Sequence, residues 1–314
     1  MQTRRLGASG LSVSRLALGT MAWGTRTSPE DAAELLTAFR EAGGTLIDTA
    51  HGYAGGAAEE LVGDLLAGPD RDEMVLMTKS GISRATGSRV VDCSRRAMMA
   101  QLDLSLRRLR TDHVDVWLAH TWDEHTPIEE TVSALVWAVQ TGRARYVGVS
   151  NHVGWQAART MSLLASAGVP MVANSVELSL VARAPEHELT AAAAALGFGL
   201  LPWSPLGRGV LAGRYRTTVA ADSRLASEEF AGFAGRHVGD HTRGVVEAVR
   251  TAATGLGVAP AVVALAWVRD RPGVAAPIIG PRTPQQLATL VASEDLELPE
   301  QIVAALDEVS TEHG

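Results

Sequence analysis

Eight short apolar runs alternate with amphipathic stretches along the whole chain, and this alternation constrains the fold more than any other feature. The runs have the length of buried strands and lie at Leu16–Leu18, Thr45–Ile47, Met74–Met77, Val114–Trp117, Arg145–Val149, Met171–Asn174, Phe198–Pro202 and Ala276–Ile279. The stretches between them have helical period, as in Glu30–Glu41, Arg95–Leu109, Ile128–Gln140 and Trp155–Ala167. Strands that alternate with helices form parallel sheets, and eight such units favour a closed (β/α)8 barrel over an open sheet.

Both ends of the chain add to this pattern. The start, TRRLGASGLSVSRLALG, has two strand-like pieces around a glycine- and serine-rich turn, which predicts a β-hairpin, and Pro299–Val309 predicts an added C-terminal helix. The longest irregular stretch, Gly213–Thr242, follows the seventh strand and is equally compatible with a lid and with a mobile surface loop. No linker is evident, so we expect one α/β TIM-barrel domain over residues 1–314.

Four polar residues whose side chains could take part in catalysis follow three consecutive strand candidates. Asp48 and Tyr53 lie in IDTAHGY, Lys79 in VLMTKS and His120 in VDVWLAH. Because the carboxyl ends of all strands in a parallel barrel meet at one rim, these side chains are predicted to gather there. A carboxylate, a phenol, an amine and an imidazole at one rim are suited to moving a proton onto a carbonyl oxygen.

The chemistry of carbonyl reduction explains this set of residue types. A tyrosine protonates the forming alkoxide if its pKa falls from about 10 toward neutrality, and a neighbouring lysine ammonium lowers it. An aspartate orients the lysine, and a histidine directs the carbonyl oxygen. Each residue alone has a simpler role: Asp48 as a turn cap, Tyr53 as a rim aromatic, Lys79 as a solvated cation and His120 as a core side chain. Their joint position at strand ends favours the catalytic role.

The motifs IDTAHGY, TKS, LAH, GVSNH, LPWSPLGRG and IIGPRTPQQL occur in this order, and with them the chain resembles the aldo-keto reductase superfamily. The resemblance covers nearly the whole chain and includes the branch of potassium-channel β subunits and bacterial reductases. It implies that Tyr53 is the general acid and base, that Lys79 and Asp48 tune it, and that His120 orients the substrate carbonyl. It also implies NADP(H) as the cofactor.

The resemblance also implies a cofactor site, formed by Ser150, Asn151, Ser175, Trp203, Ser204, Leu206, Gly207, Arg208, Gly209, Gly280, Arg282 and Gln286. In this assignment Ser150 and Asn151 hold the nicotinamide carboxamide, although a Ser-Asn turn before a helix explains them equally well without the other motifs. Trp203 stacks on the nicotinamide or packs the rim. The sequence GRGVLA at 207–212 also fits a Rossmann fingerprint, but no apolar helix follows it.

Arg282 and Gln286 favour NADP(H) over NAD(H). A guanidinium matches the oxygens of a 2′-phosphate, and Gln286 falls where relatives contact the adenosine end; a solvated Arg282 is the alternative. Three positions depart from the family pattern: Ser175 replaces a glutamine, Leu178 a common aromatic and Leu290 an asparagine. The shorter Ser175 costs one hydrogen bond or leaves it to water, about 1 kcal/mol.

The substrate pocket is predicted from four side chains just past strand candidates, Trp23, His51, Trp122 and His152. Aromatic walls favour an apolar or ring-containing aldehyde or ketone. Packing of loops onto the barrel explains the tryptophans equally well, and loops rather than the fold decide the substrate.

Composition narrows the partners and the compartment. A net charge of −7 and a pI near 5.7 argue against nucleic acid or an anionic membrane surface as the main partner. No run approaches the roughly 18 apolar residues of a membrane span, and the N-terminus does not read as a signal peptide. A single Cys93 fits a reducing compartment, so we expect a cytoplasmic protein.

Two other functions compete with an NADPH-dependent carbonyl reductase. One is a cofactor-binding regulatory subunit with slow or no turnover, which the changes at Ser175 and Leu290 keep open. The other, a metal-dependent barrel hydrolase, needs clustered His and carboxylate ligands, and no H-x-H or H-x-x-x-H pair follows a strand, so we expect no metal site. The oligomeric state is left open.

Overall fold

The computed structural model describes residues 1–68, 70–83, 87–212 and 240–311. Of the stretch Gly213–Thr242, only the last three residues are among these, and they begin helix α9 (Asp240–Leu256). The prediction of a lid therefore lies outside the described residues.

Eight parallel strands form a closed barrel, as predicted. They are β3 (Ala17–Gly19), β4 (Leu46–Asp48), β5 (Val75–Ser80), β8 (Val114–Ala119), β9 (Ala144–Ser150), β10 (Met171–Glu177), β11 (Gly199–Trp203) and β12 (Ile278–Ile279). Each pairs with the next along the chain, and β12 pairs with β3 to close the ring. Every strand overlaps one of the eight apolar runs. The six-residue segment 207–212 forms a 3-10 turn after β11, not the α-helix that a Rossmann fingerprint requires.

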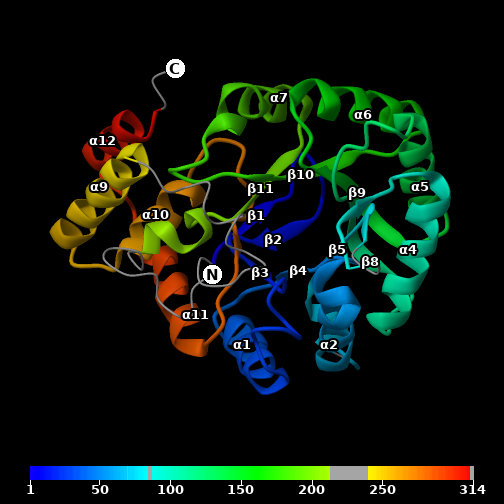
Figure 1. Cartoon of the computed structure of the whole chain (residues 1–314), viewed down its shortest axis with the longest axis horizontal. Helices are drawn as coiled ribbons and strands as arrows, with labels where there is room; N and C mark the ends of the chain where they lie inside the picture. Colours follow the sequence, from blue (N-terminus) through cyan, green and yellow to red (C-terminus); the bar gives the residue numbers. More distant parts are fainter. Residues whose placement is uncertain (69, 84–86, 213–239, 312–314) are drawn as a thin grey trace.

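Helices surround this barrel (Figure 1). The structure gives α1 (Pro29–Glu41), α2 (Ala57–Leu65), α3 (Asp70–Glu73), α4 (Arg95–Arg108), α5 (Ile128–Gln140), α6 (Gly154–Ser166), α7 (Leu189–Leu196), α9, α10 (Pro260–Arg269), α11 (Pro284–Val291) and α12 (Glu300–Ser310). The predicted helices at 30–41, 95–109, 128–140 and 155–167 are confirmed to within one residue at each end. So is the C-terminal helix. Serines at Ser28 and Ser94 cap two of them by accepting a backbone N–H three residues on.

The strands separate two hydrophobic layers because successive side chains point to opposite faces. Leu46, Met77 and Val116 belong to an inner cluster, whereas their neighbours Ile47, Leu76 and Trp117 pack in the larger cluster under the helices. A third cluster joins α9, α10 and α12 beside the barrel, through residues such as Val245, Val263 and Leu306.

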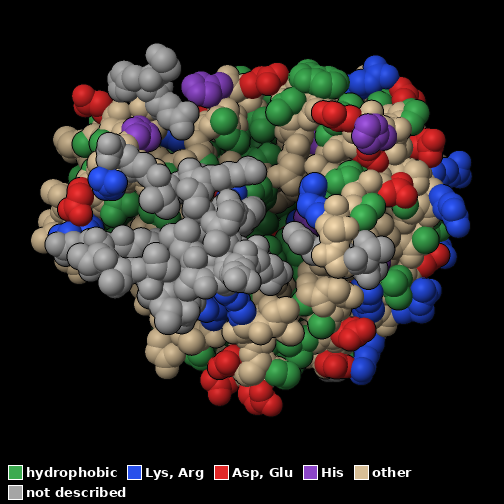
Figure 2. Space-filling view, viewed as in Figure 1, with side chains coloured by type: hydrophobic (Ala, Val, Ile, Leu, Met, Phe, Trp, Pro, Cys, Tyr) green, Lys and Arg blue, Asp and Glu red, His purple; other side chains and the backbone are tan. Residues whose placement is uncertain are grey.

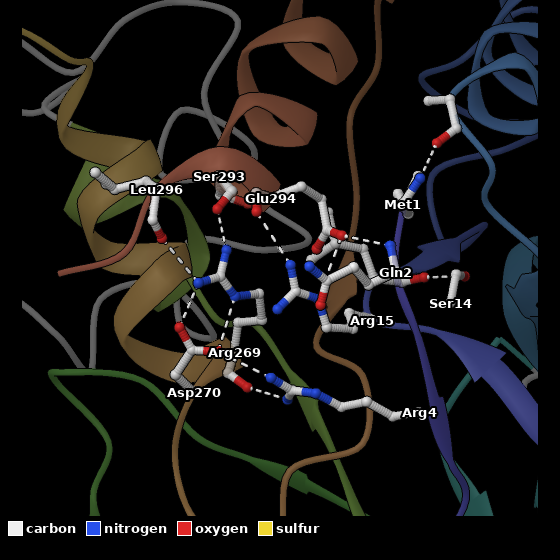
Figure 3. A network of polar contacts seen from close by, with 12 residues as sticks. Met1, Gln2, Arg4, Ser14, Arg15, Arg269, Asp270, Ser293, Glu294 and Leu296 are labelled. Carbon is white, nitrogen blue, oxygen red and sulfur yellow. Dashed lines mark hydrogen bonds and ion pairs between the residues drawn. The ribbon is translucent and has the colours of Figure 1, made fainter.

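The N-terminal hairpin closes one end of the barrel. β1 (Thr3–Arg5) and β2 (Ser12–Ser14) pair antiparallel, as predicted, and the fully buried Leu6 and Val13 join the inner cluster. Two arginines fasten this end to the C-terminal part of the chain (Figure 3): Arg4 binds Asp270, and Arg15 binds Glu294. The buried Arg269, the last residue of α10, binds the carbonyls of Ser293 and Leu296 and so holds the segment that carries Glu294. The opposite rim, where the strands end, is left for the polar side chains.

Acidic and basic side chains are intermixed along the outer edge of the face in Figure 2. Among the described residues no single helix has the length and composition of a membrane span. The helices His241–Leu256 and Pro260–Arg269 have them only when taken together, and the chain bends by 102° between them. All of α10 after its first residue is buried in the fold.

Candidate active site

The pleat of two adjacent strands directs Asp48 and Lys79 into the barrel. Asp48 lies two residues beyond the inward Leu46, and Lys79 two beyond the inward Met77, so both share the inner face. Both side chains are almost completely buried, with 4% and 3% of their surface exposed. A hydrogen-bonded ion pair joins them.

Lys79 is the centre of the site. Besides Asp48, its Nζ donates to the carbonyl of Thr49 at 3.0 Å and to the phenol oxygen of Tyr53 at 3.3 Å. Burial alone would lower the pKa of Lys79, but the negative charge of Asp48, and to a lesser degree Tyr53, raises it above its ordinary value. The ammonium therefore stays charged beside the phenol at neutral pH.

Tyr53 and His120 face each other across this rim. Tyr53 begins a 3-10 turn, η1 (Tyr53–Gly56), which follows β4, and His120 directly follows β8. Their rings meet edge to face with centroids 5.9 Å apart. The backbone N–H of His120 donates to the carbonyl of Ser80 at 2.7 Å, which ties the end of β8 to the end of β5. The four residues predicted to be catalytic are thus brought together.

A second polar group lies at the adjoining strand ends. Asn151, in the left-handed conformation with φ 58°, donates from Nδ2 to the carbonyl of His120 at 2.9 Å and accepts from the indole N–H of Trp203 at 3.0 Å. Ser150 donates to the carbonyl of Ser175 at 2.9 Å. The Oγ of Ser175 is fully buried and has no hydrogen-bond partner among the described residues. This group therefore connects His120 to Trp203.

The loop after β11 has an unusual backbone. Ser204, Gly207, Arg208 and Gly209 all adopt positive φ, at 53°, 54°, 59° and 101°. Two of the loop's backbone N–H groups donate within the turn, that of Gly207 to the carbonyl of Ser204 at 2.9 Å and that of Gly209 to the carbonyl of Leu206 at 3.0 Å. Arg208 is buried, pairs with Glu177 at 2.7 Å and lies 5.8 Å from the centre of the Trp203 ring. The partly buried Leu206 packs against the cores around it.

The predicted adenosine end lies at the start of α11. Gly280 is exposed after β12, and Arg282 is half-buried. Gln286 reaches back from the first turn, and its side-chain oxygen accepts the backbone N–H of Arg282 at 3.0 Å. Two of the departing positions, Leu178 and Leu290, are buried in the hydrophobic core.

Of the four residues predicted to form the substrate pocket, two lie together and the other two point elsewhere. Trp122 and His152 lie together, edge to face at 5.4 Å, beside the Asn151 group. Trp23 is fully buried in the core under the helices. The ring of His51 turns outward to α4, where its Nδ1 lies 3.5 Å from Ser105 and 3.4 Å from Arg108.

A third aromatic residue beside Trp122 and His152 was not predicted from the sequence. Trp155, on the first turn of α6, meets Trp122 edge to face at 5.1 Å and is 56% exposed. An exposed tryptophan in a helix with an otherwise periodic pattern was the only available signal. Among the described residues, no three His, Cys, Asp or Glu side chains gather as ligands for a metal.

Buried His152 is expected to make the protein sensitive to acid. Burial lowers its pKa from 6.5 to about 4, so the native state keeps the ring neutral while the unfolded chain binds a proton below pH 6.5. Its contribution is complete above pH 6.5 and is lost toward pH 4, by about 1.4 kcal/mol per pH unit and about 3 kcal/mol in total. The free energy of unfolding, measured with urea at several pH values between 6.5 and 4, should fall less steeply with falling pH in His152→Gln than in the wild type.

The exposed His125 provides a matched control for this experiment. His125→Gln should keep the wild-type slope, because this side chain lies at the surface and its replacement leaves the buried ring of His152 in place. Burial lowers the pKa of His51 to about 4 as well, so some acid sensitivity should remain in His152→Gln. Equal slopes in wild type and His152→Gln would show that His152 is protonated in the native state.

The sequence of this chain is similar to those of known proteins over most of its length. The sequence pattern of the family described as "Aldo/keto reductase family" matches residues 15–311. A rice protein (Oryza sativa subsp. japonica) described as a probable voltage-gated potassium channel subunit beta is 35% identical over 94% of this chain and 92% of its own length. An uncharacterised oxidoreductase of Bacillus subtilis, YrpG, is 31% identical over 98% and 96%. The L-glyceraldehyde 3-phosphate reductase of Escherichia coli K12 is 30% identical over 98% and 92%.

Proposed function

The chain belongs to the aldo/keto reductase family, and on this premise we propose that it is an NADP(H)-dependent reductase that converts an aldehyde or ketone to an alcohol, with Tyr53 as the proton donor. The observation that carries this proposal is the position of the buried Lys79 ammonium between Asp48 and the phenol oxygen of Tyr53. The reductase names of two relatives support the oxidoreductase class.

The protein residues supply the proton and direct it. The Lys79 ammonium, 3.3 Å from the Tyr53 oxygen, stabilises a phenolate electrostatically and so eases proton release from the phenol. Asp48 holds the ammonium in place, and because both groups are buried, water screens their field little. As negative charge develops on the substrate oxygen, the phenol O–H of Tyr53 transfers its proton to that oxygen.

His120 gives the carbonyl its direction. Its ring stands at the edge of the Tyr53 ring, so a substrate oxygen near the phenol is also near the imidazole. A hydrogen bond from this ring fixes the oxygen and stabilises the developing charge. Asn151 holds the backbone of His120 through the His120 carbonyl, which couples this position to the cofactor side of the rim.

The residues beside the catalytic group fit a nicotinamide nucleotide. The fully buried Ser175 Oγ lacks a partner among the described residues and adjoins Ser150 and Asn151, which suits a carboxamide. Trp203 offers an indole face, and the two glycines of the tight left-handed loop at 204–209 allow its backbone to approach a pyrophosphate closely. When bound, a nicotinamide of this kind exchanges a hydride with the carbonyl carbon. The residues of the chain bind it, orient it and handle the proton.

Titration of the purified protein with NADPH and NADH, followed by the tryptophan fluorescence to which Trp203 contributes, tests the cofactor. Quenching by NADPH at lower concentration than by NADH is the expected result, and a panel of aldehydes and ketones with NADPH then tests turnover. Absence of binding by either nucleotide would refute the proposal. Binding without turnover on the whole panel would instead favour the second candidate below.

Arg282→Ala should weaken NADPH binding far more than NADH binding. A charged hydrogen bond to a 2′-phosphate contributes about 1.5–3 kcal/mol, which corresponds to roughly a 10- to 100-fold rise in the Kd for NADPH. The exposed Arg96 on α4 provides a control, and Arg96→Ala should leave both constants unchanged. Equal weakening of NADPH and NADH binding by Arg282→Ala would show that Arg282 does not contact the 2′-phosphate.

A second candidate function is a cofactor-binding regulatory subunit with slow or no turnover. Two plant relatives favour it: the rice protein and an Arabidopsis thaliana protein, 33% identical over 94% of this chain, are both described as probable potassium channel β subunits. Capture of a stable partner by the NADPH-bound protein, together with turnover below detection, would support it. Rapid turnover of a carbonyl substrate would favour the reductase.

A further inference from the structure

One arginine holds the turn of Tyr53 from outside the barrel. Arg108, the last residue of α4, donates from Nη1 to the carbonyl of His51 at 3.2 Å and from Nη2 to the carbonyl of Gly55 at 3.3 Å. These carbonyls flank Tyr53 by two residues on each side. Because a guanidinium is a rigid planar fork, contact with both carbonyls fixes the segment between them.

The segment between these carbonyls has a backbone conformation that needs support from surrounding contacts. Ala54, Gly55 and Gly56 adopt positive φ in succession, at 49°, 65° and 112°. An alanine in the left-handed region carries an energetic cost, and such a conformation persists where surrounding contacts enforce it. A Cβ on Gly56 would lie only 2.2 Å from the Arg108 Cζ, so the glycine leaves the space that the guanidinium fills.

A buried carboxylate fixes the arginine in turn. Glu59, on α2, has no exposed side-chain surface and accepts from Arg108 Nη1 at 3.2 Å through Oε2. Its other oxygen accepts from the hydroxyl of Thr78 at 2.7 Å. Thr78 immediately precedes Lys79 on β5 and points outward where Lys79 points inward. The same group therefore touches the turn of Tyr53 and the strand of Lys79.

We propose that Arg108, anchored by Glu59, is a positioning residue that sets the distance between the Tyr53 phenol oxygen and the Lys79 ammonium. It acts from behind the turn and touches neither of these two atoms. Its kinetic consequence rests on the proposed reductase function, whereas its effect on the geometry of Tyr53 does not. A displacement of about 1 Å at a reacting group costs on the order of 10²-fold in rate.

Arg108→Ala in the full chain tests this in turnover. The expected result is a fall in kcat of about 10²-fold with little change in KM or in the Kd for NADPH, because the binding residues stay in place. Added guanidinium ion at a non-denaturing concentration should restore part of kcat by filling the vacated space. A fall in kcat that guanidinium does not restore, accompanied by an equal loss of NADPH binding, would indicate general disruption and overturn the proposal.

Tyrosinate absorbance gives a measurement that is independent of turnover. The chain has three tyrosines, so subtraction of the Tyr53→Phe titration isolates the signal of Tyr53. In Arg108→Ala this signal should appear at a higher pH than in wild type, since the phenolate lies farther from the ammonium. An unchanged titration would overturn the proposal. If the Tyr53 titration shifts in Arg108→Ala but the wild-type protein turns over no carbonyl substrate, the reductase function is refuted and the positioning role of Arg108 is retained.

Two further variants protect the test against misfolding. Glu59→Gln keeps the hydrogen bond from Thr78 but removes the charge that holds Arg108, so it should shift the Tyr53 titration in the same direction. Arg107→Ala, at the exposed neighbouring position on α4, should leave turnover and titration unchanged. If Arg108→Ala does not fold, a normal Tyr53 titration in Glu59→Gln overturns the proposal.

Discussion

Tyr53→Phe is expected to fold and to bind NADPH like the wild type while it loses about 10²- to 10⁴-fold in kcat, the usual contribution of a positioned general acid. The substitution removes one oxygen and keeps the ring that meets His120 edge to face. Tyr53 is only partly buried and packs against the barrel core through that ring, so the free energy of unfolding should change little. Steady-state kinetics and a thermal melt on the same sample measure both effects.

The pH dependence of turnover sharpens this prediction. In the wild type the proton donor is a phenol beside a charged lysine, so turnover should fall as the phenol ionises at high pH. Residual turnover in Tyr53→Phe should lack that limb, because no group at this position titrates. Tyr146→Phe, at a partly buried position on β9 away from the rim, is the matched control and should retain wild-type kinetics. Undiminished kcat in Tyr53→Phe would exclude Tyr53 as the proton donor.

The architecture and the meeting of four polar side chains at one rim were predictable because both depend on local patterns. A buried strand leaves a continuous apolar run, and the residue just past its end is carried to the rim whatever the helices do. This placed Asp48, Lys79 and His120 correctly at strand ends, and the structure brings them together with Tyr53. Short motifs in family order then extended the prediction to the group around Asn151.

Side-chain direction in the loops was not predictable in the same way. His51 follows β4 closely and was expected in the substrate pocket, but the chain turns at Ala50, whose carbonyl accepts the N–H of Tyr53 at 3.0 Å. The turn sends the ring of His51 outward to Arg108. Trp23 is likewise folded back into the core. The alternation of side chains stops where a strand stops, so it carries no information on side-chain direction in the adjoining loop.

Contacts between distant elements left no trace in the sequence pattern. Arg108 and Glu59 are separated by 49 positions and meet because α2 and α4 pack side by side. Singly, each reads as an ordinary charge on an amphipathic helix. The small hairpin of β6 (Ile82–Ser83) and β7 (Val90–Val91) was missed for a related reason, since two-residue strands carry no period.

Lys79→Met is expected to abolish measurable turnover and also to destabilise the fold, which distinguishes it from Tyr53→Phe. The substitution leaves the carboxylate of Asp48 buried, with 4% of its side chain exposed and its cation removed. Removal of one partner from a buried ion pair costs about 3–5 kcal/mol. Urea unfolding at pH 7 measures this loss, and it should diminish at acidic pH, where Asp48 is protonated in both states.

The double variant Asp48→Asn/Lys79→Met separates the two effects of this lysine. Neutralising the stranded carboxylate should restore much of the lost stability, because the penalty of Lys79→Met comes from the unpaired buried charge rather than from the missing attraction. Turnover should not return, since the phenol of Tyr53 still lacks its neighbouring ammonium. If stability and turnover returned together, the loss in Lys79→Met would be one of folding, and Lys79 would have no separate part in proton transfer. If neither stability nor turnover returned, the carboxylate of Asp48 would be required for the folded structure of the rim even without Lys79.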